Sequence, residues 1–370
     1  MPLKPRAEIA GLKACHHGGP VHAELEKLGL KADEIIDFSV SSNPFSYPPA
    51  VAEAVRGAVI DRYPDSESTE LRQALAARLG VSPANILVGS GSMEIIRLIT
   101  LAYFGNGDSV LILKPTFGEY ELAVQIAGAS VMELWSREEN NFAFDIDEAI
   151  SLIREKKPKG VFICNPNNPS GQYLTRQQVE SVLAACEDSL LVLDEAYIAF
   201  TENSWPSNGL ISRSNVVSVR SMTKDYALAG LRLGYAVSSE EIIENLRRVR
   251  PPWNVNAAAQ AAGLAALKDG DYLKRCEAKI RQSKQYLTGE LTKMGFKVLP
   301  SRTNFFLVKV GDGQRFRAAL LKYGLMLRDC TSFGLPEFVR IAALTMPECE
   351  KLIATIKMLK EKGEFPQVTI

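Results

Sequence analysis

Short apolar runs rich in β-branched residues alternate with helical patterns between residues 86 and 237. In chain order the runs read NILVG, DSVLIL, KGVFICN, SLLVLDEA, NVVSVR and LGYAV. Because a strand buried on both faces reads as a continuous apolar run, this alternation predicts βαβ units and a largely parallel sheet. Ligands bind beyond the carboxyl ends of the strands in such sheets, so chemically active residues are expected directly after each run.

The pattern changes after the break RPPWN at residues 250–254. A long helical pattern follows, then a shorter β segment, SRTNFFLVKV, and a charged helix, PECEKLIATIKMLKEKG. We therefore expect an α/β protein in three parts. These are an N-terminal arm (1–44), a large domain with a mostly parallel sheet (45–260) and a small C-terminal α+β domain (261–370).

Composition limits the classes of protein and the kinds of partner that this chain fits. The chain has 370 residues, 46% of them hydrophobic, which is enough for two domains, and its 43 basic residues balance 43 acidic ones. No basic stripe interleaved with aromatic residues is present, so neither nucleic acid nor an anionic membrane is an expected partner. The start has no apolar segment of signal-peptide length, which predicts a cytoplasmic protein. No C-x-x-C pair occurs among the six cysteines, so neither a disulfide framework nor a zinc site is indicated.

Histidine is scarce, and this restricts the chemistry. Only His16, His17 and His22 occur, all near the N-terminus. A Ser-His-Asp triad and a histidine-rich metal site are therefore poorly supported, and a lysine is the natural acid-base candidate. Lys224, in SVRSMTKDYALAGLRLGYAV, lies on the connection between two apolar strands. A partly buried lysine there has a lowered pKa and can act as a nucleophile or base, although a structural lysine fits this stretch equally well.

Three other strand ends carry polar motifs that are ambiguous alone. GSGSMEII (89–96) offers backbone N–H groups and hydroxyls to an anion, but it also fits a simple turn and helix cap. NPNNPSG (165–171) fits a pair of tight proline turns, and the carboxylate of DEAY (194–197) fits a helix cap. Their order and spacing are more informative than any one of them.

Together, GSGS, NPNNPSG, DEAY and SMTK…GLRLGY resemble the pyridoxal-phosphate enzymes of the aspartate aminotransferase superfamily, fold type I, over nearly the whole chain. The resemblance implies that Lys224 binds the cofactor covalently and that Asp194 pairs with the pyridinium nitrogen. An ionised carboxylate there keeps the ring protonated, so the ring can draw in electrons from the substrate. The resemblance also implies further cofactor contacts, which comprise Asn168 and Tyr197 at the ring oxygen, Phe117 stacked on the ring, and a phosphate cup of Ser90, Gly91, Ser92, Ser221, Thr223 and Arg232.

Two subgroups compete within this superfamily. Histidinol-phosphate aminotransferases share NPNNPSG, DEAY and AGLRLGY. Threonine-phosphate decarboxylases of cobalamin biosynthesis are similar in four stretches, HGG with DFSVSSNPF, RSMTKDYALAGLRLGY, PPWNVNAAAQAA and LMLRDCTSFGLPEFVRIA, and these favour the decarboxylase. Tyr197 and the missing first asparagine of SVSSNPF depart from the decarboxylase pattern. A non-catalytic pyridoxal-phosphate-binding protein is a third alternative, which the complete set of cofactor residues argues against.

The same resemblance implies substrate contacts and an assembly. The substrate is expected to be a small phosphorylated amino acid or amine that also contacts Asn168. In the decarboxylase, Arg340 is implied to clamp the substrate carboxylate, with Arg328 and His17 near the phosphate. In the aminotransferase, the arginines would serve the phosphate of histidinol phosphate and the carboxylate of the glutamate co-substrate. The alternatives without a function are that Arg328 forms a surface ion pair and that His17 lies on a solvated arm. The tyrosine of DRYPDSESTEL, Tyr63, is implied to reach the cofactor phosphate of a partner subunit, which predicts a homodimer with shared sites. An ordinary turn tyrosine would also fit there.

Overall fold

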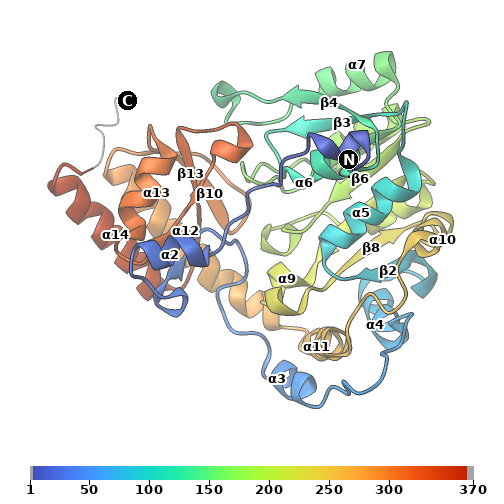
Figure 1. The fold of residues 1–370 in the computed structure, drawn as a ribbon, viewed down its shortest axis with the longest axis horizontal. Coiled ribbons are helices and arrows are strands. Elements are labelled where there is room, and N and C mark those ends of the chain that lie inside the picture. Colours follow the sequence, from blue (N-terminus) through green and yellow to red (C-terminus); the bar gives the residue numbers. More distant parts are fainter. Residues whose placement is uncertain (1–2, 365–370) are drawn as a thin grey trace.

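The computed structural model describes residues 3–364, and its largest element is a seven-stranded sheet (Figure 1). The strand order is β2-β8-β7-β6-β5-β3-β4. β8 runs antiparallel to its neighbours β2 and β7, and the other pairs are parallel. All six apolar runs form strands as predicted, so the mostly parallel sheet is confirmed. The strands are β2 (Ile86–Gly89), β3 (Ser109–Lys114), β4 (Ser130–Trp135), β5 (Gly160–Cys164), β6 (Leu190–Asp194), β7 (Val216–Ser221) and β8 (Gly234–Ser238).

Helices cover both faces of this sheet, because alternate strand residues point to opposite sides. On β3, Ile112 packs toward α5, α6 and α10, whereas Leu111 packs toward α7 and α8. Both side chains are fully buried, as is expected of a strand that reads as a continuous apolar run. The covering helices are α5 (Ser92–Tyr103), α6 (Glu119–Ile126), α7 (Ile146–Lys156), α8 (Arg176–Ala185) and α10 (Glu240–Val249).

The strand that the sequence pattern did not predict, β4, lies at the edge of the sheet. It pairs in parallel with β3 from Ser130 opposite Ser109 to Trp135 opposite Lys114. Its residues are exposed or only partly buried, and its sequence, SVMELW, includes a serine and a glutamate. An edge strand needs no continuous apolar run, since one side faces solvent, and the sequence signal is correspondingly weak.

A four-stranded sheet in the C-terminal part has the order β12-β13-β10-β9, with antiparallel pairing throughout. The N-terminal arm is attached to this part, because β1 (Ile36–Asp37) pairs in parallel with β11 (Leu325–Met326). The other strands are β9 (Lys297–Val298), β10 (Phe305–Lys309), β12 (Arg328–Asp329) and β13 (Phe338–Ala342). The helices of this part are α12 (Tyr272–Lys293), α13 (Gly313–Leu321) and α14 (Met346–Glu361).

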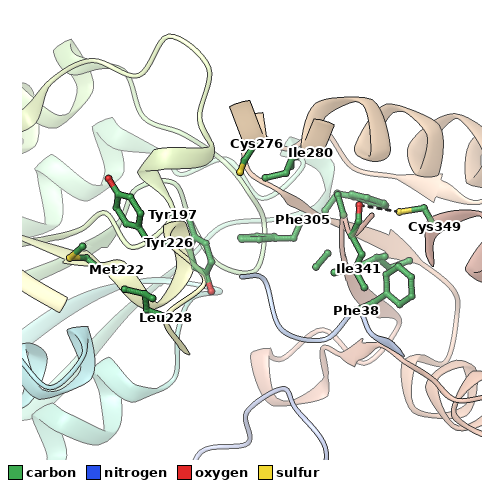
Figure 2. Packing of buried hydrophobic residues seen from close by; sticks show 14 of the residues in the cluster. Phe38, Tyr197, Met222, Tyr226, Leu228, Cys276, Ile280, Phe305, Ile341 and Cys349 are labelled. Carbon is green, nitrogen blue, oxygen red and sulfur yellow. Dashed lines mark hydrogen bonds between the residues drawn. The ribbon is translucent and has the colours of Figure 1, made fainter. Parts of the chain in front are cut away.

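A hydrophobic core continues from the seven-stranded sheet into the C-terminal part (Figure 2). Tyr197, after β6, meets Phe305 of β10 edge to face, with ring centroids 4.9 Å apart. The predicted boundary at residue 260 falls within α11, so the division into domains stays a prediction. The remaining helices are α1 (Ala7–Ala10), α2 (His22–Lys27), α3 (Pro49–Arg56), α4 (Thr69–Leu79), α9 (Met222–Asp225) and α11 (Ala257–Lys268). Within residues 3–364, no helix is both long and apolar enough to cross a membrane.

Candidate active site

A cavity of about 840 Å³ opens at the carboxyl ends of β5, β6 and β7, where the strand pattern predicted ligand binding. Most of the predicted site residues line it, although they are spread over more than 300 positions of the chain. The predicted residues in its wall are His17, Ser92, Phe117, Asn168, Asp194, Tyr197, Thr223, Lys224, Arg232, Arg328 and Arg340.

Lys224 lies on the one-turn helix α9, between β7 and β8, as its position between two apolar runs predicted. Burial, with the nearby positive charges of Arg340 and Arg232, lowers the pKa of the Lys224 ammonium to about 8. Asn43 donates its backbone N–H to the carbonyl oxygen of Lys224 at 2.7 Å, which ties this turn to the arm. A lysine with this pKa is neutral in a large fraction of molecules near pH 8, so its nitrogen can act as a nucleophile.

Asp194 ends β6 and is 3% exposed. Tyr120 donates its hydroxyl to Oδ2 of Asp194 at 2.6 Å, and Ala196 donates its backbone N–H to Oδ1 at 2.9 Å. Burial raises the pKa of Asp194 to about 6, although both hydrogen bonds act in the opposite direction. The carboxylate is therefore ionised at neutral pH and can pair with a cationic ring nitrogen.

Tyr197, Asn168 and Arg340 form another wall of the cavity. Burial raises the pKa of Tyr197 to about 12, so its hydroxyl stays protonated and can donate a hydrogen bond. Arg340 donates from Nη1 to Oδ1 of Asn168 and from Nη2 to the carbonyl oxygen of Ser39, the latter at 2.7 Å. The buried Nε of Arg340 has no partner in the structure, so this guanidinium retains a donor.

The predicted phosphate cup is formed only in part by side chains that face the cavity. Ser92, Thr223 and Arg232 line the cavity, whereas Ser221 lies behind it, with its Oγ 2.6 Å from Oγ1 of Thr223. A Cβ at Gly91, where φ is +81°, would lie 2.8 Å from Nη2 of Arg232, so only glycine lets the guanidinium approach this closely.

The backbone N–H groups of two predicted cup residues already donate hydrogen bonds within the protein. Ser90 donates its backbone N–H to Oε2 of Glu94 at 2.6 Å, and Gly91 donates its own to the carbonyl oxygen of Gly89 at 2.8 Å. Neither residue is part of the cavity wall. Their roles as phosphate ligands therefore stay predictions, and the arrangement favours Ser92, Thr223 and Arg232 as anion donors.

The N-terminal arm lies over the cavity and is held by charged residues. Arg328, which is 6% exposed, donates to the carbonyl oxygens of His17 and His16 at 2.9 and 2.6 Å. Nε2 of His17 lies 2.9 Å from Oε1 of Glu119, and Arg97 donates to the other oxygen of Glu119 at 2.9 Å. Arg328 is thus buried in this cavity, not part of a surface ion pair.

Tyr63 does not line the cavity of its own chain. Its side chain is 75% exposed and stacks on Trp253, with ring centroids 4.3 Å apart and planes inclined at 21°. An exposed aromatic pair of this kind is common where another protein surface docks. The predicted role of Tyr63 across a subunit interface stays a prediction.

Among the residues missed in the sequence analysis, three contact predicted site residues directly. Tyr120 reaches Asp194, Glu119 reaches His17, and Asn43 holds the turn that carries Lys224. Glu119 and Tyr120 closely follow Phe117 in the segment after β3. This position after a strand is the sequence signal that could have identified them as site residues. Within residues 3–364, no group of three or more His, Cys, Asp or Glu side chains is placed to hold a metal ion.

Comparisons with known proteins agree over almost the whole chain. The family "Aminotransferase class I and II" matches residues 33–356. A histidinol-phosphate aminotransferase from Moorella thermoacetica is 34% identical over 362 residues, 96% of this chain and 92% of that protein. One from Thermoanaerobacter pseudethanolicus is 37% identical over 362 residues, 96% of this chain and 97% of that protein. The crystal structure of the Sinorhizobium meliloti enzyme of this name, in complex with pyridoxal 5'-phosphate, has a TM-score of 0.86 at 27% identity, over 96% of this chain and 98% of its own.

Proposed function

The chain belongs to the class I and II aminotransferase family of pyridoxal-phosphate-dependent enzymes, and on this basis we propose that it is a histidinol-phosphate aminotransferase. The observation that carries the proposal is the near-full-length similarity to proteins of that name, at 33–37% identity. This similarity favours the aminotransferase over the decarboxylase that the four sequence stretches favoured. Fold and cofactor alone would fit either reaction.

The residues of the cavity fit pyridoxal phosphate. When bound, this cofactor supplies an electron sink for the bonds at the substrate Cα. Lys224 offers an amine with a lowered pKa, Asp194 a carboxylate for the ring nitrogen, and Tyr197 a protonated hydroxyl for the ring oxygen. Arg232, with the hydroxyls of Ser92 and Thr223, would hold the phosphate by charge-assisted hydrogen bonds. Phe117 and Asn168 complete the proposed set.

Lys224 is also the proposed proton carrier. A general acid-base group works best when its pKa lies near the operating pH, and burial brings the pKa of Lys224 to about 8. With substrate bound, the neutral Lys224 amine would accept the proton that leaves the substrate Cα, and the resulting ammonium would later donate that proton. Tyr197, whose ring centroid is 6.0 Å from Nζ of Lys224, packs beside this amine.

Two arginines would bind the acidic groups of the substrates. In an aminotransferase, Arg328 with His17 would face the phosphate of histidinol phosphate, and Arg340 the carboxylate of the glutamate co-substrate. Arg340 lines the cavity, and its buried Nε has no hydrogen-bond partner in the structure. A bidentate arginine contact is selective for planar carboxylates and for phosphates, so these two positions would set substrate choice.

One observation favours decarboxylation of O-phosphothreonine as a second candidate. Arg328 of β12 and Arg340 of β13 are directly paired residues of the antiparallel ladder, and both side chains line the cavity. Directly opposed residues of such a ladder lie about 5 Å apart. Two neighbouring cations suit a substrate that carries a carboxylate and a phosphate together, and phosphothreonine is such a molecule.

A pair of assays should distinguish the two reactions. With L-histidinol phosphate, we expect the holoenzyme to convert one equivalent, shift the absorption of its cofactor, and resume turnover only when 2-oxoglutarate is added. With O-phospho-L-threonine and no keto acid, it should release no carbon dioxide. Sustained release of carbon dioxide and 1-amino-2-propanol phosphate, with no turnover of histidinol phosphate, would replace the first candidate with the second.

Tyr63 supports a further proposal, a homodimer in which each site borrows this residue from the partner. Mixing Tyr63→Phe chains with Lys224→Ala chains should then give hybrid dimers with one intact site each, because the two lesions fall in the same site. The mixture should be more active than the mean of the two parent dimers. Activity equal to that mean would argue for sites built from one chain. Native mass spectrometry of the mixture, which separates dimers by the small mass difference between the two chains, checks that hybrid dimers have formed.

A further inference from the structure

Tyr120 is a buried tyrosine whose hydroxyl is directed at the carboxylate proposed to meet the cofactor ring. It lies on α6 and is 0% exposed, and its hydroxyl donates to Oδ2 of Asp194 at 2.6 Å. A hydrogen bond of this length from a hydroxyl to a carboxylate belongs to the charge-assisted class, which is about twice as strong as a neutral one. The bond therefore acts on the ionised form of Asp194.

The ring of Tyr120 is fixed by its aromatic neighbours. It stacks on Phe162 of β5, with centroids 5.0 Å apart and planes inclined at 23°, and it meets Phe117 edge to face at 5.5 Å. Phe117 is the residue proposed to stack on the cofactor. Since the ring cannot rotate freely between these two neighbours, the position of its hydroxyl is set before any ligand binds.

Among the groups that face Asp194, Tyr120 is the one that most favours the ionised carboxylate. Burial raises the pKa of Asp194, and the largest opposing effect on this pKa is the Tyr120 hydrogen bond, ahead of the Ala196 N–H. Burial keeps Cys164 and Tyr197 protonated by raising the pKa of each to about 12. Glu195 pairs with Arg220 at 3.0 Å. None of these three residues contributes a positive charge to the Asp194 carboxylate.

We propose that Tyr120 is a positioning residue, which holds the Asp194 carboxylate ionised and in one orientation for the ring nitrogen of the cofactor. The proposal rests on the proposed role of Asp194, but not on which substrate is used. Tyr120 itself would touch neither the substrate nor the reacting atoms. Its effect should appear in the binding of the cofactor ring and in the pH dependence of that binding.

The test measures binding of pyridoxine 5'-phosphate, which has no aldehyde to react with Lys224, to the apoenzyme between pH 5 and 9. In the wild type the affinity should fall below a midpoint near pH 6, because protonated Asp194, whose pKa is about 6, cannot form an ion pair with the protonated ring nitrogen. In Tyr120→Phe the midpoint should move to higher pH, and the affinity at pH 7 should be about tenfold lower. Phenylalanine keeps the aromatic packing.

Two controls separate this role from a structural one. Tyr103→Phe removes a tyrosine hydroxyl bonded to Asn245 outside the cavity and should leave both affinity and midpoint unchanged. In an Asp194→Asn background, Tyr120→Phe should cause no further loss of affinity, because the two residues act through one bond. An unchanged midpoint in Tyr120→Phe, or a full additional loss in that background, would overturn the proposal. Both measurements involve no substrate, so they stand apart from the choice of reaction.

Discussion

Replacement of Lys224 by alanine should reduce turnover by about four orders of magnitude or more, because the change removes the nucleophile and the proton carrier together. The cofactor should still bind non-covalently, since Asp194 and the cationic Arg232 remain in the cavity wall. In the wild type, borohydride reduction should fix the cofactor to a peptide that contains Lys224. Single-turnover and steady-state assays with L-histidinol phosphate and 2-oxoglutarate measure the loss.

Lys284 provides a matched control for this experiment. Burial lowers the pKa of Lys284 to about 8 as well, but its ammonium donates to the carbonyl oxygens of Ser301 and Thr303 and lines a different cavity. Lys284→Ala should therefore keep nearly normal turnover, with its thermal unfolding recorded to separate folding from chemistry. Near-normal turnover in Lys224→Ala, or labelling at Lys284 in its place, would remove Lys224 from the active site.

Asp194→Asn should have the second-largest effect, with two consequences of opposite sign. Turnover should fall by about a thousandfold, because the neutral amide no longer keeps the ring nitrogen protonated. The apoprotein should become more stable at pH 8, by about 3 kcal/mol, because asparagine removes a buried carboxylate whose pKa is about 6 in the folded protein against an ordinary 3.8. A functional carboxylate would thus be retained at a cost in stability.

The sign of this stability effect follows from the direction of the pKa shift. A carboxylate whose folded pKa is raised destabilises the folded state fully above that pKa, and the penalty disappears as the pH falls toward the unfolded value. The advantage of Asp194→Asn should therefore be largest above pH 6 and shrink from pH 6 toward pH 4. Urea unfolding of the apoprotein across this range tests it. Asp225→Asn is the matched control. Burial raises the pKa of Asp225 to about 7, so this variant should also gain stability, but it should not lose cofactor affinity. If the free energies of unfolding of the wild type and of Asp194→Asn differ by the same amount at all pH values, the raised pKa of Asp194 is contradicted.

Much of the fold and most of the site were predictable from the sequence, because their signals are local. A continuous apolar run predicts a buried strand, and the residue after it lies at a known edge of the sheet. The motifs that contain Asn168, Asp194 and Lys224 were located in this way, the resemblance supplied their expected roles, and the structure brings all three residues to one cavity. The same reasoning missed β4, whose edge position requires no apolar run.

The sequence by itself determined the class of fold and the strand ends that carry polar motifs, while the set of cofactor residues came from the resemblance to the aminotransferase superfamily and stays a proposal. Only the tertiary structure decided which distant residues act on them. It paired Arg328 with Arg340 through strand register, bound Arg328 to the arm at His17, and brought Tyr120 to Asp194 across 74 positions. Strand formation and turn chemistry depend on neighbouring residues. Contacts between remote segments depend instead on how helices pack on the sheet, which no local pattern encodes.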